Sequence, residues 1–239
     1  MSLGQSPPGS IVPPPAAGPG AGAGGPEALL ALHRRIEGCT ACPLHATRTR
    51  AVPGDGPVTA RIMAVGEAPG ENEDRTGRPF VGAAGQLLTR LLPAIGLDRQ
   101  DIYICNVLKC RPPGNRDPEA IEVGACAHFL DEQVALIRPD VILLLGRHAV
   151  ARLLAGMPGI SRIHGQRVRR GDRLYVPLFH PAAALYNASL LRTLEEDMQR
   201  VRGYLDEAQA ERERLQREQA EEAARAAAVR AADEQLTLF

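Results

Sequence analysis

The middle of the chain alternates between short, wholly apolar runs and longer stretches whose apolar residues recur every three or four positions. The first pattern predicts strands at residues 61–66, 101–108, 140–146 and 173–179. The second predicts helices at residues 27–38, 84–95, 118–138 and 148–154 and from 189 onward. Asp117 and Pro118 look like the cap and first turn of the third helix. Strands separated by helices, and apolar on both faces, predict a parallel sheet between helical layers.

Both ends of the chain depart from this pattern. Residues 1–26 consist mainly of Pro, Gly and Ala, so we expect them to be disordered. Residues 27–202 then form the single folded domain. Residues 203–234 are almost entirely Ala, Glu, Arg and Gln, which favours a solvated helix or a frayed tail because no apolar stripe would dock it. The last five residues, from Gln235 to Phe239, are again largely apolar.

Composition narrows the class of protein. Apolar residues make up 44% of the chain but aromatic residues only 3%, so the core must be aliphatic and each aromatic residue needs a reason. The net charge of zero hides a slightly basic body and an acidic tail, which is compatible with a polyanionic partner without requiring one. No run is long and apolar enough for a membrane span, and no signal peptide is evident. We therefore expect a soluble, cytoplasmic protein, in which cysteines serve as ligands or reactive thiols.

Four of the five cysteines form a candidate metal centre. Cys39 and Cys42 form a Cys-x-x-Cys pair after the first helix, Cys110 follows the second strand, and Cys126 lies in the next helix. Four thiolates suit either tetrahedral zinc or a 4Fe–4S cluster, and spacing alone does not distinguish the two. The simpler alternative is that Cys110 and Cys126 are buried thiols, as we expect of Cys105.

Three polar or aromatic residues stand where packing alone does not explain them. Phe80 lies in a loop, where it either stacks on a ligand or anchors the loop. Asn106 interrupts an apolar strand, and a buried amide is costly unless a ligand or the protein pairs it. His180 ends the last strand, where it either caps the backbone or stabilises a developing negative charge.

Two loops add weaker signals. The turn Gly66-Glu67-Ala68-Pro69-Gly70 follows the first strand, at the edge where open α/β sheets bind ligands. Five arginines precede the last strand and would contact phosphates or line a solvated hairpin. They are Arg162, Arg167, Arg169, Arg170 and Arg173.

Five motifs, taken together and in order, resemble the family 4 uracil-DNA glycosylases of bacteria and archaea. The resemblance covers about residues 30–202. The motifs are Cys-Thr-Ala-Cys-Pro-Leu from Cys39, Gly-Glu-Ala-Pro-Gly from Gly66, Gly-Arg-Pro-Phe-Val-Gly from Gly77, Asn-Val-Leu-Lys-Cys-Arg-Pro-Pro from Asn106, and His-Pro-Ala-Ala from His180.

The resemblance implies a fold, a cofactor and a reaction. The fold is an α/β three-layer αβα sandwich around a four-stranded parallel sheet. The cofactor is a structural 4Fe–4S cluster held by Cys39, Cys42, Cys110 and Cys126. The reaction, a step of base excision repair, flips deoxyuridine out of DNA and hydrolyses its N-glycosidic bond, so that uracil is released and an abasic site remains.

The same resemblance assigns roles in a uracil pocket. Phe80 stacks on the base, Asn106 reads its O4 and N3–H, and neutral His180 donates to its O2. Glu67 and Glu73 are pocket residues, and either would orient water or stabilise the sugar cation. Ala68 occupies the position where better-known glycosylase families place an aspartate.

Asn115 would help to hold DNA or the pocket wall, and the apolar run after Pro181 would wedge into the minor groove. A related group of proteins that crosslinks to DNA carries a histidine-bearing insertion after the strand that contains the Asn. This chain has no such insertion after the Asn106 strand, so we expect it to release its product and turn over.

The partners follow from this interpretation. Uracil-containing DNA is the expected substrate of a monomeric enzyme. The terminal peptide from Gln235 to Phe239 resembles the bacterial sliding-clamp-binding peptide Gln-Leu-x-Leu-Phe, although a chance apolar terminus would look the same. Two other classes stay open: a non-catalytic iron–sulfur DNA-binding module, and a zinc-stabilised nucleotide-binding protein.

Overall fold

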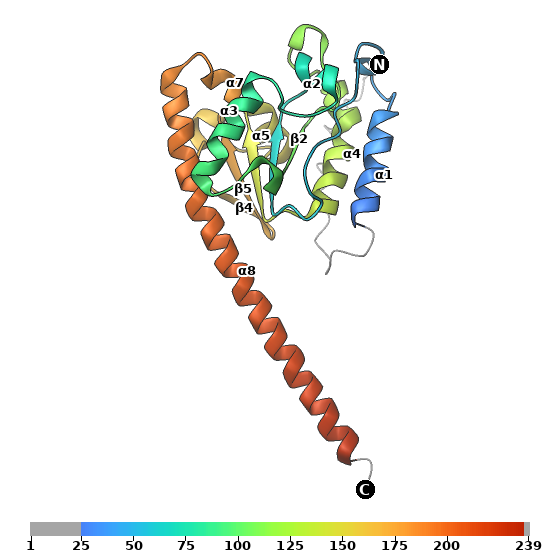
Figure 1. The fold of residues 1–239 in the computed structure, drawn as a ribbon, viewed down its shortest axis with the longest axis vertical. Coiled ribbons are helices and arrows are strands. Elements are labelled where there is room, and N and C mark those ends of the chain that lie inside the picture. Colours follow the sequence, from blue (N-terminus) through green and yellow to red (C-terminus); the bar gives the residue numbers. More distant parts are fainter. Residues whose placement is uncertain (1–24, 237–239) are drawn as a thin grey trace, which may run out of the picture.

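The computed structural model describes the backbone of residues 25–236 and the side chains of residues 25–226. The predicted disordered segment 1–26 therefore lies almost wholly outside the described residues, as does the terminal peptide 235–239 apart from two backbone positions. The described chain forms a sheet with helices on both faces and one long helix that projects from the body (Figure 1).

The sheet contains the four predicted parallel strands and a fifth strand that sequence analysis missed. In spatial order they are β2 (Ile102–Asn106), β1 (Ile62–Gly66), β3 (Val141–Leu145), β5 (Arg173–Leu178) and β4 (Val168–Arg170). The edge strand β4 pairs antiparallel with β5 and forms a hairpin with it. It was missed because its three residues include two arginines, which we assigned to a basic loop.

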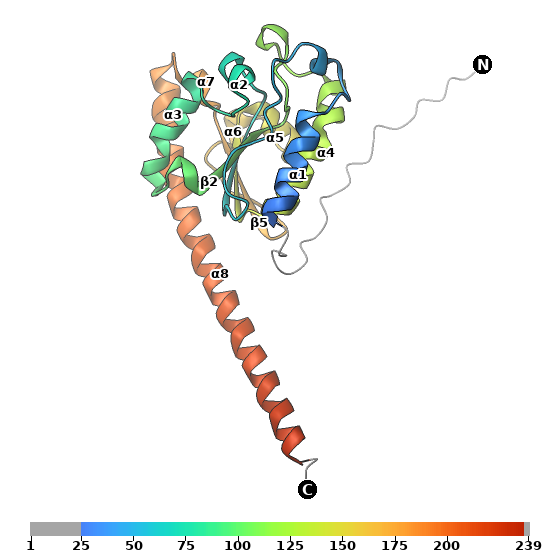
Figure 2. The same ribbon diagram turned by 45° about the vertical axis from the view of Figure 1, so that its right-hand side comes forward.

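Alternation along the strands builds two cores, one on each face of the sheet. Ile62, Ala64 and their neighbours of the same parity pack against α3 (Ala83–Leu91), η2 (Leu92–Ile95) and α8 (Ala188–Leu236). Met63, Val65 and the residues aligned with them pack against helices on the other face. Those helices are α1 (Gly25–Glu37), α4 (Ala120–Ile137) and α5 (Arg147–Leu153). The turned view separates these layers (Figure 2). The αβα sandwich is confirmed.

Short elements occupy the connections. They are η1 (Pro43–Ala46), α2 (Glu71–Thr76), η3 (Arg99–Asp101), η4 (Pro113–Asn115), α6 (Ile160–Ile163) and α7 (Pro181–Ala184).

The start of α4 differs from the prediction. The helix begins at Ala120 with Glu119 as its N-cap, because the buried Glu122 carboxylate accepts the Glu119 N–H at 2.8 Å and pairs with Arg116. Asp117 lies before the helix and forms an ion pair with Arg147 instead. The predicted cap and first turn, Asp117 and Pro118, are therefore wrong.

The last helix continues past the predicted domain boundary at residue 202. Met198 and Val201 are fully buried, and Tyr204, Leu205 and Ala208 still pack against the core. Beyond Ala208, described contacts with the body are ion pairs, as between Arg212 and Asp140 at 3.0 Å, and side chains 212–226 are exposed.

Arginines of the hairpin formed by β4 and β5 make ion pairs with this helix. Arg167 forms an ion pair with Glu207, and Arg169 lies 2.8 Å from Glu211. Since β4 directly precedes β5 in the chain, the hairpin turn lies at the amino end of β5, away from His180, which follows its carboxyl end. This arrangement favours the protein-bound hairpin over a phosphate contact for these two arginines.

Within the described residues, no helix combines the length and apolar character that crossing a bilayer demands.

The docked and projecting parts of α8 should respond differently to truncation of an apolar side chain. Met198→Ala should lower the free energy of unfolding by about 2–5 kcal/mol, because it opens a cavity in a fully buried position. Leu215→Ala, at a position that is 45% exposed, should change it by no more than about 0.5 kcal/mol. Urea unfolding followed by circular dichroism measures both. Equal effects would contradict the docking of α8 through Met198.

Candidate active site and cysteine centre

The predicted pocket residues meet at one edge of the sheet. Gly66 ends β1, Asn106 ends β2, and His180 follows β5 by two residues. These strands are parallel, so their carboxyl ends share an edge, which is where open α/β sheets bind ligands. Residues that are up to 114 positions apart in sequence therefore come together because of strand order.

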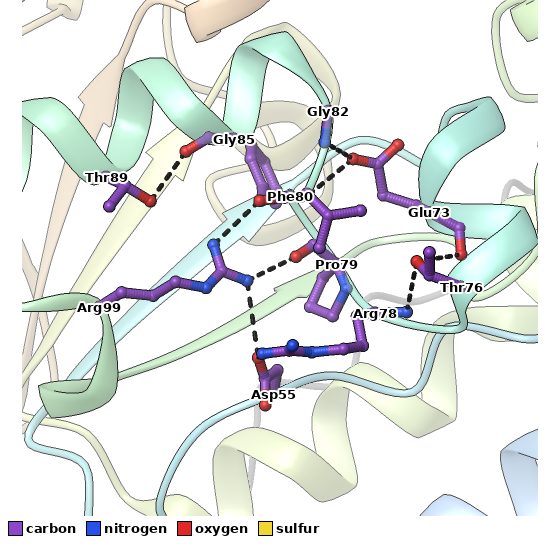
Figure 3. A network of polar contacts seen from close by, with 11 residues as sticks. Asp55, Glu73, Thr76, Arg78, Pro79, Phe80, Gly82, Gly85, Thr89 and Arg99 are labelled. Atoms are coloured by element: carbon purple, nitrogen blue, oxygen red, sulfur yellow. Dashed lines mark hydrogen bonds and ion pairs between the residues drawn. The ribbon is translucent and has the colours of Figure 1, made fainter.

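Phe80 has a strained backbone that two side chains hold in place (Figure 3). Its φ of +51° is in the left-handed region, which costs a non-glycine residue about 1–3 kcal/mol. The Glu73 carboxylate accepts the N–H groups of Val81 at 2.9 Å and Gly82 at 2.8 Å. From the other side, Arg99 donates to the carbonyls of Pro79 at 2.6 Å and Phe80 at 2.9 Å. The loop is thus fixed before any ligand binds.

Two glycines make room for this arrangement. A Cβ at Gly85 would overlap the Phe80 carbonyl, and a Cβ at Gly66 would overlap both the Phe80 ring and the Asn106 amide oxygen. Phe80 and Asn106 therefore converge on the glycine that ends β1. A side chain there would separate the ring from the amide.

Asn106 carries an unpaired polar atom. The residue is 2% exposed, and within the described part of the chain its Oδ1 has no hydrogen-bond partner. A buried acceptor without a donor costs about 1–3 kcal/mol. The satisfied structural asparagine that sequence analysis left open does not fit this geometry, whereas a ligand that brings an N–H group does.

His180 is held in one tautomer. Its Nδ1 accepts the N–H of Ala182 at 3.1 Å, so in the neutral ring the proton is on Nε2. Burial lowers the pKa of His180 to about 4, which keeps the ring neutral near pH 7. The ring stacks on Phe80, with 5.8 Å between centroids and 29° between planes. His180 therefore caps the backbone through Nδ1, as one of its two possible roles required, and its Nε2–H stays free to donate.

The two predicted catalytic carboxylates have different surroundings. The Glu73 carboxylate accepts hydrogen bonds from the N–H groups of Val81 and Gly82. It also accepts one from the N–H group of Gly70, at 3.1 Å. Glu67 makes no such backbone contact through its carboxylate. Its Oε2 lies 3.6 Å from Nε2 of His148, and burial raises the pKa of the Glu67 carboxyl group. Of the two, Glu67 is the one available to a water molecule.

The two remaining predicted pocket residues have side-chain contacts with other parts of the fold. Ala68 packs on the cysteine side of the fold, in the core between α1 and α4. Asn115 is exposed on the loop after β2, where its Oδ1 accepts a hydrogen bond from Arg111 at 2.7 Å.

Two neighbours of the site were not predicted. His148 follows the carboxyl end of β3 by three residues, so the strand-end rule could have found it. Arg99 gave no sequence signal, because its partners are backbone carbonyls 19 and 20 residues away.

The four predicted ligand cysteines line one cavity between α1, η1, the segment after β2, and α4. All four are free thiols, and Ile36, His45, Arg48, Lys109 and Phe129 are among the other lining residues. Arg48 donates to Sγ of Cys110 at 3.1 Å. Cys105 is fully buried in the sheet and takes no part in this lining.

The spacing of the sulfurs bears on which metal they suit. Tetrahedral zinc, with Zn–S bonds of about 2.3 Å, holds its sulfurs about 3.8 Å apart. Among the described residues, no three cysteine sulfurs lie within 4.8 Å of one another. The four free thiols are therefore spread more widely than the sulfurs of a bound tetrahedral zinc.

Comparison with known proteins agrees with this geometry. The model of the uracil DNA glycosylase superfamily matches residues 53–205. A type-4 uracil-DNA glycosylase of Thermotoga maritima is 46% identical over 75% of this chain and 95% of its own length. Type-4 enzymes of Sulfurisphaera tokodaii and Archaeoglobus fulgidus are 45% and 47% identical over 74% and 73% of this chain, and over 84% and 92% of theirs.

The chain belongs to the type-4 uracil-DNA glycosylases. The family resemblance drawn from the five motifs is thereby confirmed. In this member of the family, Phe80 contacts His180, and Phe80 and Asn106 both approach Gly66. Glu67 directly follows that glycine, and Glu73 binds the backbone of the Phe80 loop.

The depressed pKa of His180 predicts a pH dependence of stability. Its folded pKa, about 4, is below the ordinary value of 6.5, so the unfolded chain binds this proton more readily. Stability from this residue is therefore complete above pH 6.5 and is lost as pH falls toward 4. His180→Asn should flatten the fall in the free energy of unfolding across that range, measured by urea titration at several pH values. His33 is present in both proteins and cancels. An unchanged slope would contradict the neutral assignment.

Proposed function

We propose that this protein is a uracil-DNA glycosylase that flips deoxyuridine out of DNA and hydrolyses the bond between base and sugar. The observation that carries the proposal is the buried, unpaired amide oxygen of Asn106 beside the Phe80 ring and the His180 imidazole. This set offers an acceptor, a flat face and a neutral donor. Uracil presents the matching N3–H donor, a planar ring and a carbonyl acceptor.

The chemistry follows from these roles. The C1′–N1 bond breaks with its electron pair going to uracil, whose developing negative charge spreads to O2. The Nε2–H of His180 donates to that oxygen, and a neutral donor held before reaction avoids the cost of reorganisation. Water adds to C1′ and loses its proton to the Glu67 carboxylate. The uracil anion takes up one proton and Glu67 returns one to solvent, so that free uracil and an abasic site are the products.

Glu67 rather than Glu73 is the proposed base for water. Its carboxylate has no backbone partner, and burial raises its pKa, which makes it a better proton acceptor than an ordinary glutamate. Glu73 acts on the loop that carries Phe80. Asn115 is proposed to act on DNA from its exposed loop, and Ala68 to shape the turn that carries Glu67.

Cys39, Cys42, Cys110 and Cys126 hold a 4Fe–4S cluster in this proposal. The single cavity that all four cysteines line and the similarity to type-4 relatives support that assignment. The cluster supplies no step of the hydrolysis. It ties the segment after α1 and the segment after β2 to α4, and so gives the chain a rigid surface beside the pocket.

The DNA contact is proposed to include the segment after His180. Tyr186 is 94% exposed although tyrosine is scarce in this chain, and it lies two residues beyond α7. Such a side chain could fill the space that an extruded nucleotide leaves. One chain supplies every pocket residue, so the enzyme is proposed to act as a monomer, in the cytoplasm.

A strand-cleavage assay tests the proposed reaction. The protein is incubated with a uracil-containing oligonucleotide, and abasic sites are then cleaved with alkali. Asn106→Ala, His180→Ala and Glu67→Gln should each lower the rate at saturating enzyme by at least about a hundredfold, as expected when a transition-state contact is removed. Iron content and absorbance near 400 nm should match wild type.

The matched control is Glu71→Gln, which alters a carboxylate on the neighbouring helix whose side chain is 78% exposed. Iron-loaded wild-type protein that leaves deoxyuridine intact in every DNA context would refute the proposal, as would variants that all cleave at the wild-type rate.

The terminal peptide is a separate part of the proposal. Leu236, Leu238 and Phe239 would fill an apolar groove of a replication sliding clamp, with Gln235 making polar contacts. The preceding helix α8 would hold the peptide away from the body and raise its effective concentration at the clamp.

Deletion of residues 235–239 tests the clamp contact. The truncated protein should lose binding to immobilised sliding clamp by at least about tenfold, because the apolar anchors are gone. Its excision rate on a short oligonucleotide should stay at the wild-type level. Leu215→Ala serves as a control on the same helix. Undiminished clamp binding after the deletion would overturn this part.

A further inference from the structure

Lys109 is the only lysine in the sequence, and it is buried. The residue is 1% exposed. It lies three positions after Asn106 and directly before Cys110, so it stands between the proposed uracil pocket and the cysteine centre. None of the roles described so far uses it.

The Lys109 ammonium fixes the backbone of the pocket residue. Its Nζ donates to the carbonyl oxygen of Asn106 at 2.5 Å and to Oε1 of Gln133 at 2.7 Å. Gln133 in turn donates to the Pro53 carbonyl at 2.7 Å and to the Tyr103 hydroxyl at 2.8 Å. The amide of Gln133 is therefore oriented with its oxygen toward Lys109. This network sets the end of β2 against α4.

These partners leave the charge of Lys109 unbalanced. Both acceptors are neutral, and so is the buried Cys105 thiol that also contacts Lys109, because burial raises the pKa of that thiol. Within residues 25–226 no carboxylate oxygen lies within 4.0 Å of Nζ. A buried ammonium without a counter-charge is strongly destabilising. A negatively charged group is therefore expected near Nζ of Lys109, and the carboxylates of the described residues do not supply it.

The cysteine cavity lies next to this residue. Lys109 lines it together with all four ligand cysteines. Four thiolates around a 4Fe–4S core carry net negative charge, because the thiolates outweigh the core.

We propose that Lys109 is the buried counter-charge of the cluster and, through the same ammonium group, the positioning residue that fixes Asn106 in the uracil pocket. The inference rests on the proposed function for its second half. One side chain then links cluster retention to pocket geometry, because the same ammonium group donates directly to the Asn106 carbonyl. Loss of the cluster would leave the ammonium unbalanced and loosen the end of β2.

Arg48 provides a matched comparison. It also brings a positive charge to the cysteines, since it donates to Sγ of Cys110 at 3.1 Å and to the Glu37 carbonyl at 2.8 Å. In contrast to Lys109, it has no contact with Asn106 among the interactions of the described residues. Removal of either charge should weaken the cluster, but only removal of Lys109 should also disturb the pocket directly.

The experiment compares Lys109→Met and Arg48→Met in the full-length, iron-loaded protein. Two quantities are measured: the rate at which a chelator bleaches the absorbance near 400 nm, and the single-turnover excision rate per bound cluster at saturating DNA. Both variants should lose the cluster at least about tenfold faster than wild type, as expected for the loss of a charge-assisted contact. Lys109→Met should also excise uracil at least about tenfold more slowly per cluster, and Arg48→Met by less than about threefold.

Lys109→Arg keeps the proposal testable if the methionine variant does not fold. It preserves the charge but cannot place a compact ammonium group against the Asn106 carbonyl. It should retain the cluster nearly as well as wild type while excision per cluster falls. Cluster loss equal to wild type in Lys109→Met, or equally fast loss in the arginine and methionine variants, would overturn the role as counter-charge. Equal excision per cluster in wild type and both Lys109 variants would overturn the positioning role.

The chelator measurement needs no uracil excision. A wild-type protein without glycosylase activity would therefore refute the proposed function and leave the counter-charge result interpretable on its own.

Discussion

The pocket depends on the left-handed backbone of Phe80, which the chain would not adopt without support. Glu73 binds the N–H groups after Phe80, and Arg99 binds the carbonyls at and before it (Figure 3). Because a carboxylate and a guanidinium group hold opposite sides of one loop, the strained conformation becomes the stable one. The ring is then fixed over the glycine that ends β1 and against His180. A pocket organised in advance loses little entropy on binding a flat base.

At the same edge of the sheet, several polar groups have hydrogen-bonding capacity that the described residues do not use. Asn106 Oδ1 has no partner within the described chain, and the Nε2–H of His180 is left free because Nδ1 is bound to Ala182. Glu67 keeps its carboxylate clear of the backbone, whereas Glu73 gives all of its capacity to the loop. The other buried side-chain atoms without a partner among the described residues, Nε of Arg152 and Nε of Arg173, lie elsewhere, so Asn106, His180 and Glu67 are grouped by their place at one edge of the sheet. That concentration is what distinguishes a site from an ordinary strand end.

In the proposed function, the cysteine centre is a cofactor site that also supports the pocket. Its cysteines come from three separate segments, and Lys109, which lines the same cavity, donates directly to the Asn106 carbonyl. The long helix α8 contributes elsewhere. Its first half completes one core and occupies the basic hairpin, and its second half extends into solvent (Figure 1). Catalysis, cofactor binding and tethering are thus assigned to separate parts of the molecule.

The sequence by itself determined the parallel strands and most helices, and it singled out four cysteines and the trio of Phe80, Asn106 and His180. These follow from local periodicity, or from residue types that break it. It did not determine β4, whose two arginines gave no apolar signal, or the start of α4, which a buried Glu122 contact sets. Only the tertiary structure distinguished the surroundings of Glu67 and Glu73, brought the four cysteines to one cavity and recruited Arg99, His148 and Lys109. The physical reason is that these features are contacts between distant segments, whose geometry is set by how helices and strands pack, and periodicity along the chain carries no record of such distances.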